Sequence, residues 1–180
     1  MNRRSFVAAL GATAAVNVAK PARATVASAE KKLRELGIVL PEPSGPVAVY
    51  VPYRISGNQV YIAGQIPPLD TDVPAVGKVG GDLTVEQGYA AARLVGLKIL
   101  AQLRAACDGD LDRVVQAVQI RGFVNCTGDF TAQPSVINGV SDLFRDVFGE
   151  AGLAARAALG TNALPLNAAV EVESLFEIRK

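Results

Sequence analysis

A single arginine, Arg156, stands among small and apolar residues at positions 155–160. Its guanidinium group stays protonated in proteins and carries five N–H donors, so it needs an anion to face. A segment with two glutamates, Glu171 and Glu173, follows after a short turn. The anion is therefore either a carboxylate of this protein or a ligand. If the anion is a ligand, Arg156 binds a small carboxylate and belongs to a functional site. If it is a carboxylate of the protein, Arg156 has a structural role.

The composition excludes several kinds of chemistry. The 180 residues contain no histidine, which excludes histidine bases, histidine metal sites and Ser-His-Asp catalysis. The two cysteines, Cys107 and Cys126, are too few for a zinc cluster. We expect both to be small buried residues, although an exported protein could join them in a disulfide. The net charge of +1 gives no reason to expect attraction of nucleic acid.

The elements that must position these residues follow from periodicity. Residues 170–178 alternate between apolar and polar, which predicts a strand with one buried face. The chain is 50% hydrophobic and 19% charged, as in one globular domain. The expected order is β-β-α-β-α-β-β, an α+β fold in which two helices cover one face of a mixed sheet. The ranges expected before the two final strands are a short helix at 28–37, strands at 47–54, 59–66 and 114–126, and helices at 84–106 and 134–149.

Residues 1–24 have the pattern of a targeting segment. A twin-arginine start at residues 2–6 precedes a weakly apolar run at 7–18 and a small-x-small cleavage pattern at 22–24. The run is too short to span a bilayer. We therefore expect twin-arginine export to the periplasm, no membrane contact after cleavage, and a folded domain at residues 28–180. The alternative is an amphipathic N-terminal helix of a cytoplasmic protein.

Three stretches carry recognisable motifs. The first runs from Ala155-Arg156 through Leu164-Pro165 to the Val-Glu-Val-Glu sequence that begins at Val170. The second is Ile-Ala-Gly-Gln-Ile-Pro at residues 62–67, and the third is Gly-Lys-Val-Gly-Gly-Asp-Leu-Thr-Val-Glu-Gln-Gly at 77–88. Together they resemble the Rid family, also called YjgF-like or endoribonuclease L-PSP, in its chorismate-mutase-like sub-branch. The resemblance covers about residues 28–180.

This resemblance implies a fold and an activity. Rid proteins have the chorismate-mutase-like fold and form homotrimers, with active sites in clefts between subunits. Members of the family hydrolyse imines or enamines of 2-amino acids to 2-oxo acids and ammonia. They need no cofactor and no metal. The expected partners are therefore a small carboxylated metabolite and further copies of the same chain, and not nucleic acid.

The resemblance also implies roles for five residues. Arg156 matches the invariant arginine that holds the substrate carboxylate as a bidentate pair. Glu171, fifteen positions later, would position the attacking water or polarise the imine nitrogen. Tyr50 and Asn138 match a tyrosine and a helix asparagine of the family site, and backbone groups around Gly64 would line the pocket.

Each of these residues also has a purely structural interpretation. Arg156 would then form an ion pair with a glutamate of the last strand, and Glu171 would be a surface carboxylate. Tyr50 would be a rim or core aromatic, and Asn138 a polar residue near the start of a helix. Gly64 would then allow a tight turn of the backbone at the end of a strand. The sequence leaves these alternatives open.

Two positions depart from the deaminase pattern. Ala63 stands where the family has a serine before Gly-Gln, and Ala158 where it has a cysteine two residues after the arginine. A hydroxyl and a thiol are lost, while the anion-binding arginine is kept. A non-catalytic binder of small carboxylic acids is therefore the alternative to an imine hydrolase. The lack of histidine and of an aromatic platform disfavours a ribonuclease.

Overall fold

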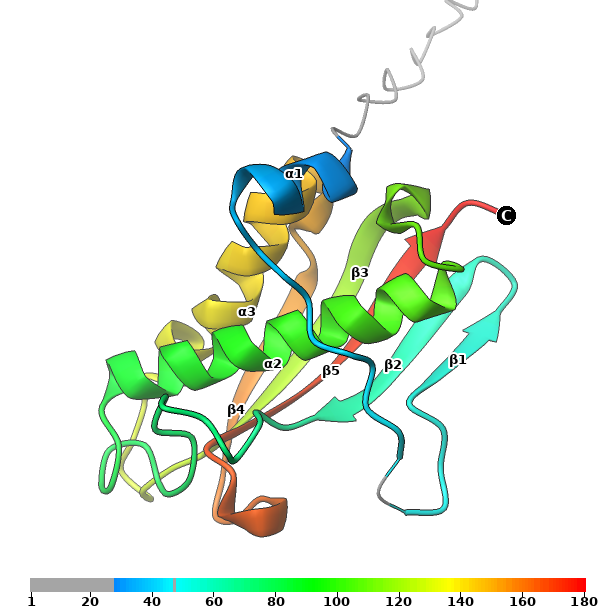
Figure 1. Ribbon diagram of the computed structural model, residues 1–180. Coiled ribbons are helices and arrows are strands. Elements are labelled where there is room, and N and C mark those ends of the chain that lie inside the picture. Colours follow the sequence, from blue (N-terminus) through cyan, green and yellow to red (C-terminus); the bar gives the residue numbers. More distant parts are fainter. Residues whose placement is uncertain (1–27, 47) are drawn as a thin grey trace, which may run out of the picture.

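The computed structural model describes residues 28–46 and 48–180 (Figure 1). The targeting segment expected at residues 1–24 lies outside the described residues, so export stays a prediction. No helix among the residues that are described combines the length and the apolar character needed to cross a membrane.

One five-stranded sheet forms the centre of the fold (Figure 1). The strand order is β1-β2-β5-β3-β4; β3 and β4 run parallel, and the other neighbours are antiparallel. The strands are β1 (Tyr53–Ser56), β2 (Gln59–Gln65), β3 (Val114–Asn125), β4 (Ala155–Thr161) and β5 (Val170–Ile178). The C-terminal strand therefore lies in the middle of the sheet, and the edge strand β4 carries Arg156.

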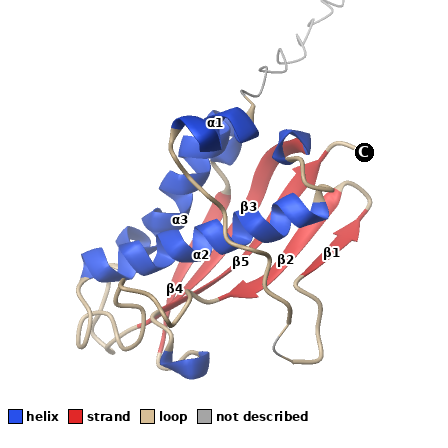
Figure 2. Ribbon diagram, in the orientation of Figure 1, coloured by secondary structure: helices blue, strands red, loops and turns tan. Residues whose placement is uncertain are grey.

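Two long helices, α2 (Val85–Ala106) and α3 (Gln133–Phe148), cover one face of the sheet (Figure 2). The short α1 (Ala29–Glu35), which was expected at residues 28–37, packs against α3. A capping box begins α2: Thr84 Oγ1 accepts from the Gln87 N–H, and the Gln87 side chain accepts from the Thr84 N–H. The predicted α+β class and mixed sheet are confirmed.

The core lies between the helices and the sheet. Phe144 and Phe148 of α3 meet Phe176 of β5, with ring centroids 5.3 to 6.4 Å apart. The alternation of β5 sends every second side chain into this layer, where five of them are buried: Val170, Val172, Ser174, Phe176 and Ile178. The strand that carries Glu171 is thus held rigidly by its other face.

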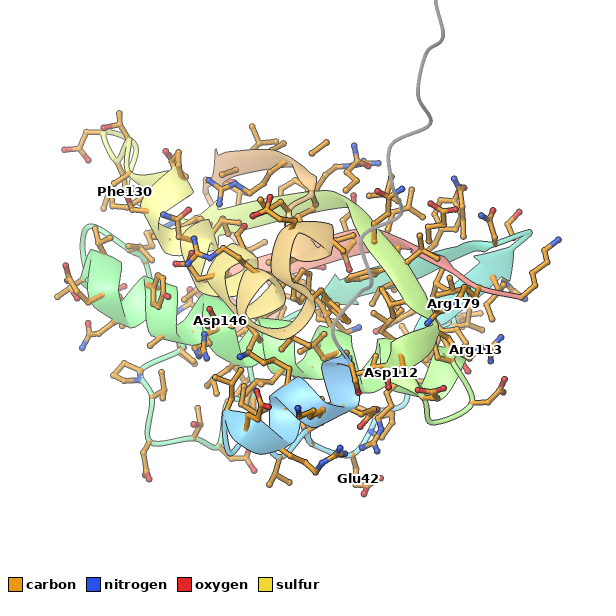
Figure 3. All side chains as sticks on the ribbon, turned by 90° about the horizontal axis from the view of Figure 1, so that it is seen from above. Glu42, Asp112, Arg113, Phe130, Asp146 and Arg179 are labelled. Atoms are coloured by element: carbon orange, nitrogen blue, oxygen red, sulfur yellow. The ribbon has the colours of Figure 1, made fainter. Side chains whose placement is uncertain are left out.

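The opposite face of the sheet has no helix over it in the described chain (Figures 1 and 3). We call it the open face. Tyr61 and Leu159 are exposed there at 46% and 51%, and Phe123 and Leu175 are half-buried. A sheet face with aromatic and aliphatic side chains is unusual for a surface that meets only water.

The first strand is shorter than predicted. Strand β1 begins only at Tyr53, and residues 48–52 of the expected strand belong to a connector with bends. Proline at position 52 has no N–H to donate to a ladder. Its carbonyl still accepts the Ala63 N–H at 3.0 Å, so the connector runs beside β2 although it is not a strand.

Gly96 of α2 lies at a point of tight packing against another element. A Cβ at this position would lie 2.8 Å from Leu143 Cδ2 and 3.6 Å from Val140 Cα. Both neighbours belong to α3. The glycine therefore allows the close approach of α2 to α3.

Candidate functional site

Arg156 lies near the start of β4 and pairs with Ile120 of β3. Ile120 is buried under the helices, and paired residues point to the same face of a sheet, so Arg156 leaves the sheet on the helix side. Its Nη1 donates to Asn138 Oδ1 at 2.8 Å and to Ser141 Oγ at 3.0 Å. Its Nη2 approaches the Pro134 carbonyl oxygen at 3.5 Å. The exposed guanidinium is thus held against α3 by neutral groups.

No carboxylate of the described residues lies within ion-pair distance of Arg156. The neighbouring Arg121 does pair with Glu173, at 3.0 Å, on the open face. The interpretation of Arg156 as an intrachain ion pair is therefore wrong. Within the same residues its Nε makes no hydrogen bond, so one edge of the guanidinium fork remains able to take a bidentate carboxylate.

Asn138 was expected near the arginine, and the structure brings the two into contact. Ser141 was not expected, although it makes an equivalent hydrogen bond. The two residues are three positions apart on α3, which places them on the same helix face. This spacing was the signal in the sequence by which Ser141 could have been found.

Glu171 lies on the open face, opposite Phe123 of β3. The side chain is half-buried, and this burial, with a smaller effect of the neighbouring Glu173 charge, raises its pKa. Gly64 of β2 lies directly beside the carboxylate, and a Cβ added there would overlap a carboxylate oxygen. The absence of a side chain at Gly64 therefore leaves room for the Glu171 carboxylate.

Tyr50 lies in the connector before β1 and is 43% exposed. Because Pro52 hydrogen-bonds to Ala63, the connector follows the β2 side of the sheet. Arg156 lies on β4, at the opposite edge. The structure therefore places Tyr50 far from the arginine within one chain.

Arg156 and Glu171 do not meet within one chain. Glu171 pairs with Phe123, and Phe123 pairs with Leu159, three residues beyond Arg156 on β4. Three residues along a strand and two strand spacings each amount to about 10 Å. The two side chains also leave opposite faces of the sheet. A small ligand therefore cannot contact both in the same subunit.

The candidate site thus consists of two separate parts. The arginine group contains Arg156, Asn138 and Ser141. The glutamate group contains Glu171 and Gly64. The first can bind an anion, and the second can hold a proton or order a water molecule.

The two departures from the deaminase pattern lie in different parts of the sheet. Ala158 follows Arg156 on the same face of β4, pairs with Gly122 and packs against the core. Ala63 lies on β2, next to Gly64. One missing group therefore belongs beside the arginine and the other beside the glutamate.

Residues 30–178 match the family described as "YjgF/chorismate_mutase-like, putative endoribonuclease". Protein TCP17 of Trypanosoma cruzi is 46% identical over 147 residues, which cover 81% of this chain and 91% of that protein.

Two crystal structures share the fold at high identity. Atu1372 from Agrobacterium tumefaciens, a protein of unknown function, is 42% identical, with a TM-score of 0.77 over 84% of this chain and 92% of that one. A Shewanella oneidensis protein with the same endoribonuclease description is 36% identical, with a TM-score of 0.79 over 84% of this chain and 100% of that one. The chain therefore belongs to the YjgF/chorismate-mutase-like family, the Rid family that its three motifs resemble.

Proposed function

We propose that this protein hydrolyses imines or enamines of 2-amino acids to 2-oxo acids and ammonia. The observation that carries the proposal is the state of Arg156. Its guanidinium is exposed, is fixed by Asn138 and Ser141, and has no carboxylate partner among the described residues. A cation oriented in this way is suited to the carboxylate of a small ligand.

Anchoring the carboxylate would place the imine carbon at a defined distance from the catalytic groups. This converts part of the activation barrier into binding energy. Asn138 and Ser141 would contribute indirectly, because they occupy Nη1 and so leave the Nε edge for the substrate. A lysine at position 156 would keep the charge but lose the planar fork.

Glu171 is the proposed acid and base. Water would attack the imine carbon while the C=N electrons move to nitrogen, which takes a proton from the carboxyl group. One proton of the added water then passes through the carboxylate to the same nitrogen, which becomes an ammonium leaving group. The C–N bond of this carbinolamine breaks as the remaining hydroxyl proton returns to the carboxylate, and ammonia leaves. A carboxyl group whose pKa is raised by burial is better suited to donate the first proton near neutral pH.

A site that uses both groups needs two copies of the chain, because one chain keeps Arg156 and Glu171 on opposite faces. We propose the homotrimer that is typical of the family, with the arginine group of one subunit facing the glutamate group of the next. The apolar side chains on the open face support burial against another copy.

The activity is tested by measuring ammonia release from freshly generated 2-iminopropanoate, with and without the protein. Hydrolysis should be accelerated, and Arg156→Ala should abolish the acceleration. Binding of 2-oxo acids without any acceleration would replace the proposal with its alternative, a non-catalytic binder of small carboxylic acids. That alternative is favoured by Ala63 and Ala158, which lack the hydroxyl and the thiol of the deaminase pattern.

The shared site is tested by complementation. Arg156→Ala and Glu171→Gln chains should each be inactive alone. Co-expressed in equal amounts, they should form mixed trimers in which about a quarter of the sites receive both intact groups. Recovery of about a quarter of the wild-type rate supports an intersubunit site, and no recovery contradicts it.

The endoribonuclease description of the family names a third activity. RNA cleavage by the purified protein that survives Arg156→Ala and Glu171→Gln would show that neither proposed group carries the function. The proposal predicts that RNA is left intact.

A further inference from the structure

A cleft of about 690 Å³ lies where β3 and β4 end and α3 begins. Its wall includes Lys78, Thr127, Phe130, Gln133 and Thr161. Figure 3 shows Phe130 at one end of the molecule, far from Arg113 and Arg179 at the other. None of the residues in the arginine group or the glutamate group lines this cleft. It is therefore a separate feature of the described chain.

Lys78 brings a fixed positive charge to this cleft. Its Nζ donates to Asn125 Oδ1 at 2.9 Å and to the carbonyl oxygens of Cys126 and Asn162. All three acceptors are neutral. They fix the position of the ammonium group without neutralising its charge. An anion that binds in the cleft would therefore interact with a positive charge that is already oriented.

The acidic residues near the cleft do not pair with this charge. Asp82 accepts the backbone N–H of Lys78 at 2.9 Å, and makes no ion pair with its ammonium group. Asp129 lies in the loop before α3 and is exposed. Lys78 is the only charged residue among those that line the cleft in the described chain.

Polar and apolar groups complete the lining. The hydroxyl of Thr127 can donate a hydrogen bond to an oxyanion. The Thr161 hydroxyl already donates to the Ala163 carbonyl oxygen at 3.1 Å, and Gln133 Nε2 donates to the Phe130 carbonyl oxygen at 2.7 Å. The start of α3 has no side-chain cap, so its positive end adds to the same potential. The half-buried ring of Phe130 offers a flat apolar surface next to these groups.

We propose that this cleft binds the carboxylate or phosphate group of a small organic anion, with its apolar part against Phe130. Lys78 supplies the charge. The cleft is distinct from the proposed imine site, because Gly160 in its wall is four residues from Arg156, or about 13 Å along β4.

The test is calorimetric titration of the full chain at low salt with four probes: inorganic phosphate, acetate, phenyl phosphate and benzoate. The phosphate and carboxylate arms identify the preferred anion, and the aromatic arms test the contribution of Phe130. Lys78→Met should weaken binding at least about tenfold. This change also removes the hydrogen bonds of the ammonium group. The affinity of Lys78→Met is therefore compared with wild type only if the two proteins unfold at the same temperature.

Gly128 provides a second, gentler pair of variants. It lines the cleft, and a Cβ there meets no atom within 4 Å. Gly128→Glu adds an opposing charge and should weaken binding of the preferred anion about tenfold, whereas Gly128→Ala should leave it unchanged. This pair decides the question if Lys78→Met is unstable.

Retention of binding in Arg156→Ala supports the assignment to this cleft, whether or not the protein has imine hydrolase activity. Three results would overturn the proposal: no binding of any probe, unchanged binding in Gly128→Glu, or loss of binding in Arg156→Ala.

Discussion

The arginine group and the glutamate group are built in different ways. Arg156 is exposed and is oriented by the hydrogen bonds that it donates to two side chains on α3. Glu171 is half-buried and owes its position to the missing side chain at Gly64. A charge held by polar contacts keeps its affinity for ligands, while a carboxyl group held by packing acquires a raised pKa. The two halves therefore suit binding and proton transfer respectively.

The strongest test of this contrast is removal of the anion-binding charge. Arg156→Ala should weaken the binding of pyruvate about 100-fold, because a bidentate charge-assisted pair contributes roughly 3 kcal/mol. Isothermal titration calorimetry measures the effect. Arg145→Ala is the matched control, since Arg145 is also exposed, lies on α3 and pairs with Asp142 at 2.9 Å. Equal affinity of both variants for pyruvate would refute the role of Arg156.

The packing of the glutamate group is tested at Gly64. Gly64→Ala should displace the Glu171 carboxylate, lower the rate of imine hydrolysis about tenfold and reduce the free energy of unfolding by about 1–3 kcal/mol. Rates of ammonia release and urea unfolding measure both effects. Gly45→Ala is the control, because a Cβ at Gly45 meets no atom within 4 Å. If Gly64→Ala behaves like Gly45→Ala, the close approach is not important for function.

The hydrogen bonds of the arginine group should have smaller effects. Asn138→Ala and Ser141→Ala each remove one acceptor from Nη1 and should raise KM about three- to tenfold, with kcat less affected. Steady-state kinetics measures the split. Ser135→Ala, an exposed serine of the same helix, should change neither constant. A fall in kcat alone would mean that these residues do more than orient Arg156.

The smallest expected effect is on the pH dependence of stability. Burial raises the pKa of Glu171 in the folded state, so the folded protein keeps this proton to higher pH than the unfolded chain. The stability that Glu171 contributes is therefore greatest below the ordinary glutamate pKa and falls as pH rises through the raised value. Glutamine does not titrate, so Glu171→Gln should gain stability relative to wild type across this window. Urea unfolding at several pH values measures the difference, and a pH-independent difference would contradict it.

Local patterns predicted most of the elements because their causes are local. Ser28 accepts a hydrogen bond from the Lys31 N–H at the start of α1, as its type and position suggest. Leu33 of α1 is buried, whereas Leu36 is 42% exposed because it follows the end of the helix. Contacts between distant elements were less predictable, as the packing of Gly96 against α3 illustrates.

The sequence by itself determined the family, the alternation of β5 and the presence of an arginine that needs an anion. Only the tertiary structure decided that Arg156 faces α3 while Glu171 faces away from it. The physical reason is the strand order, in which β5 enters between β2 and β3 and leaves β4 at the edge. Strand order and register depend on packing between residues far apart in the chain, which periodicity within one segment does not encode.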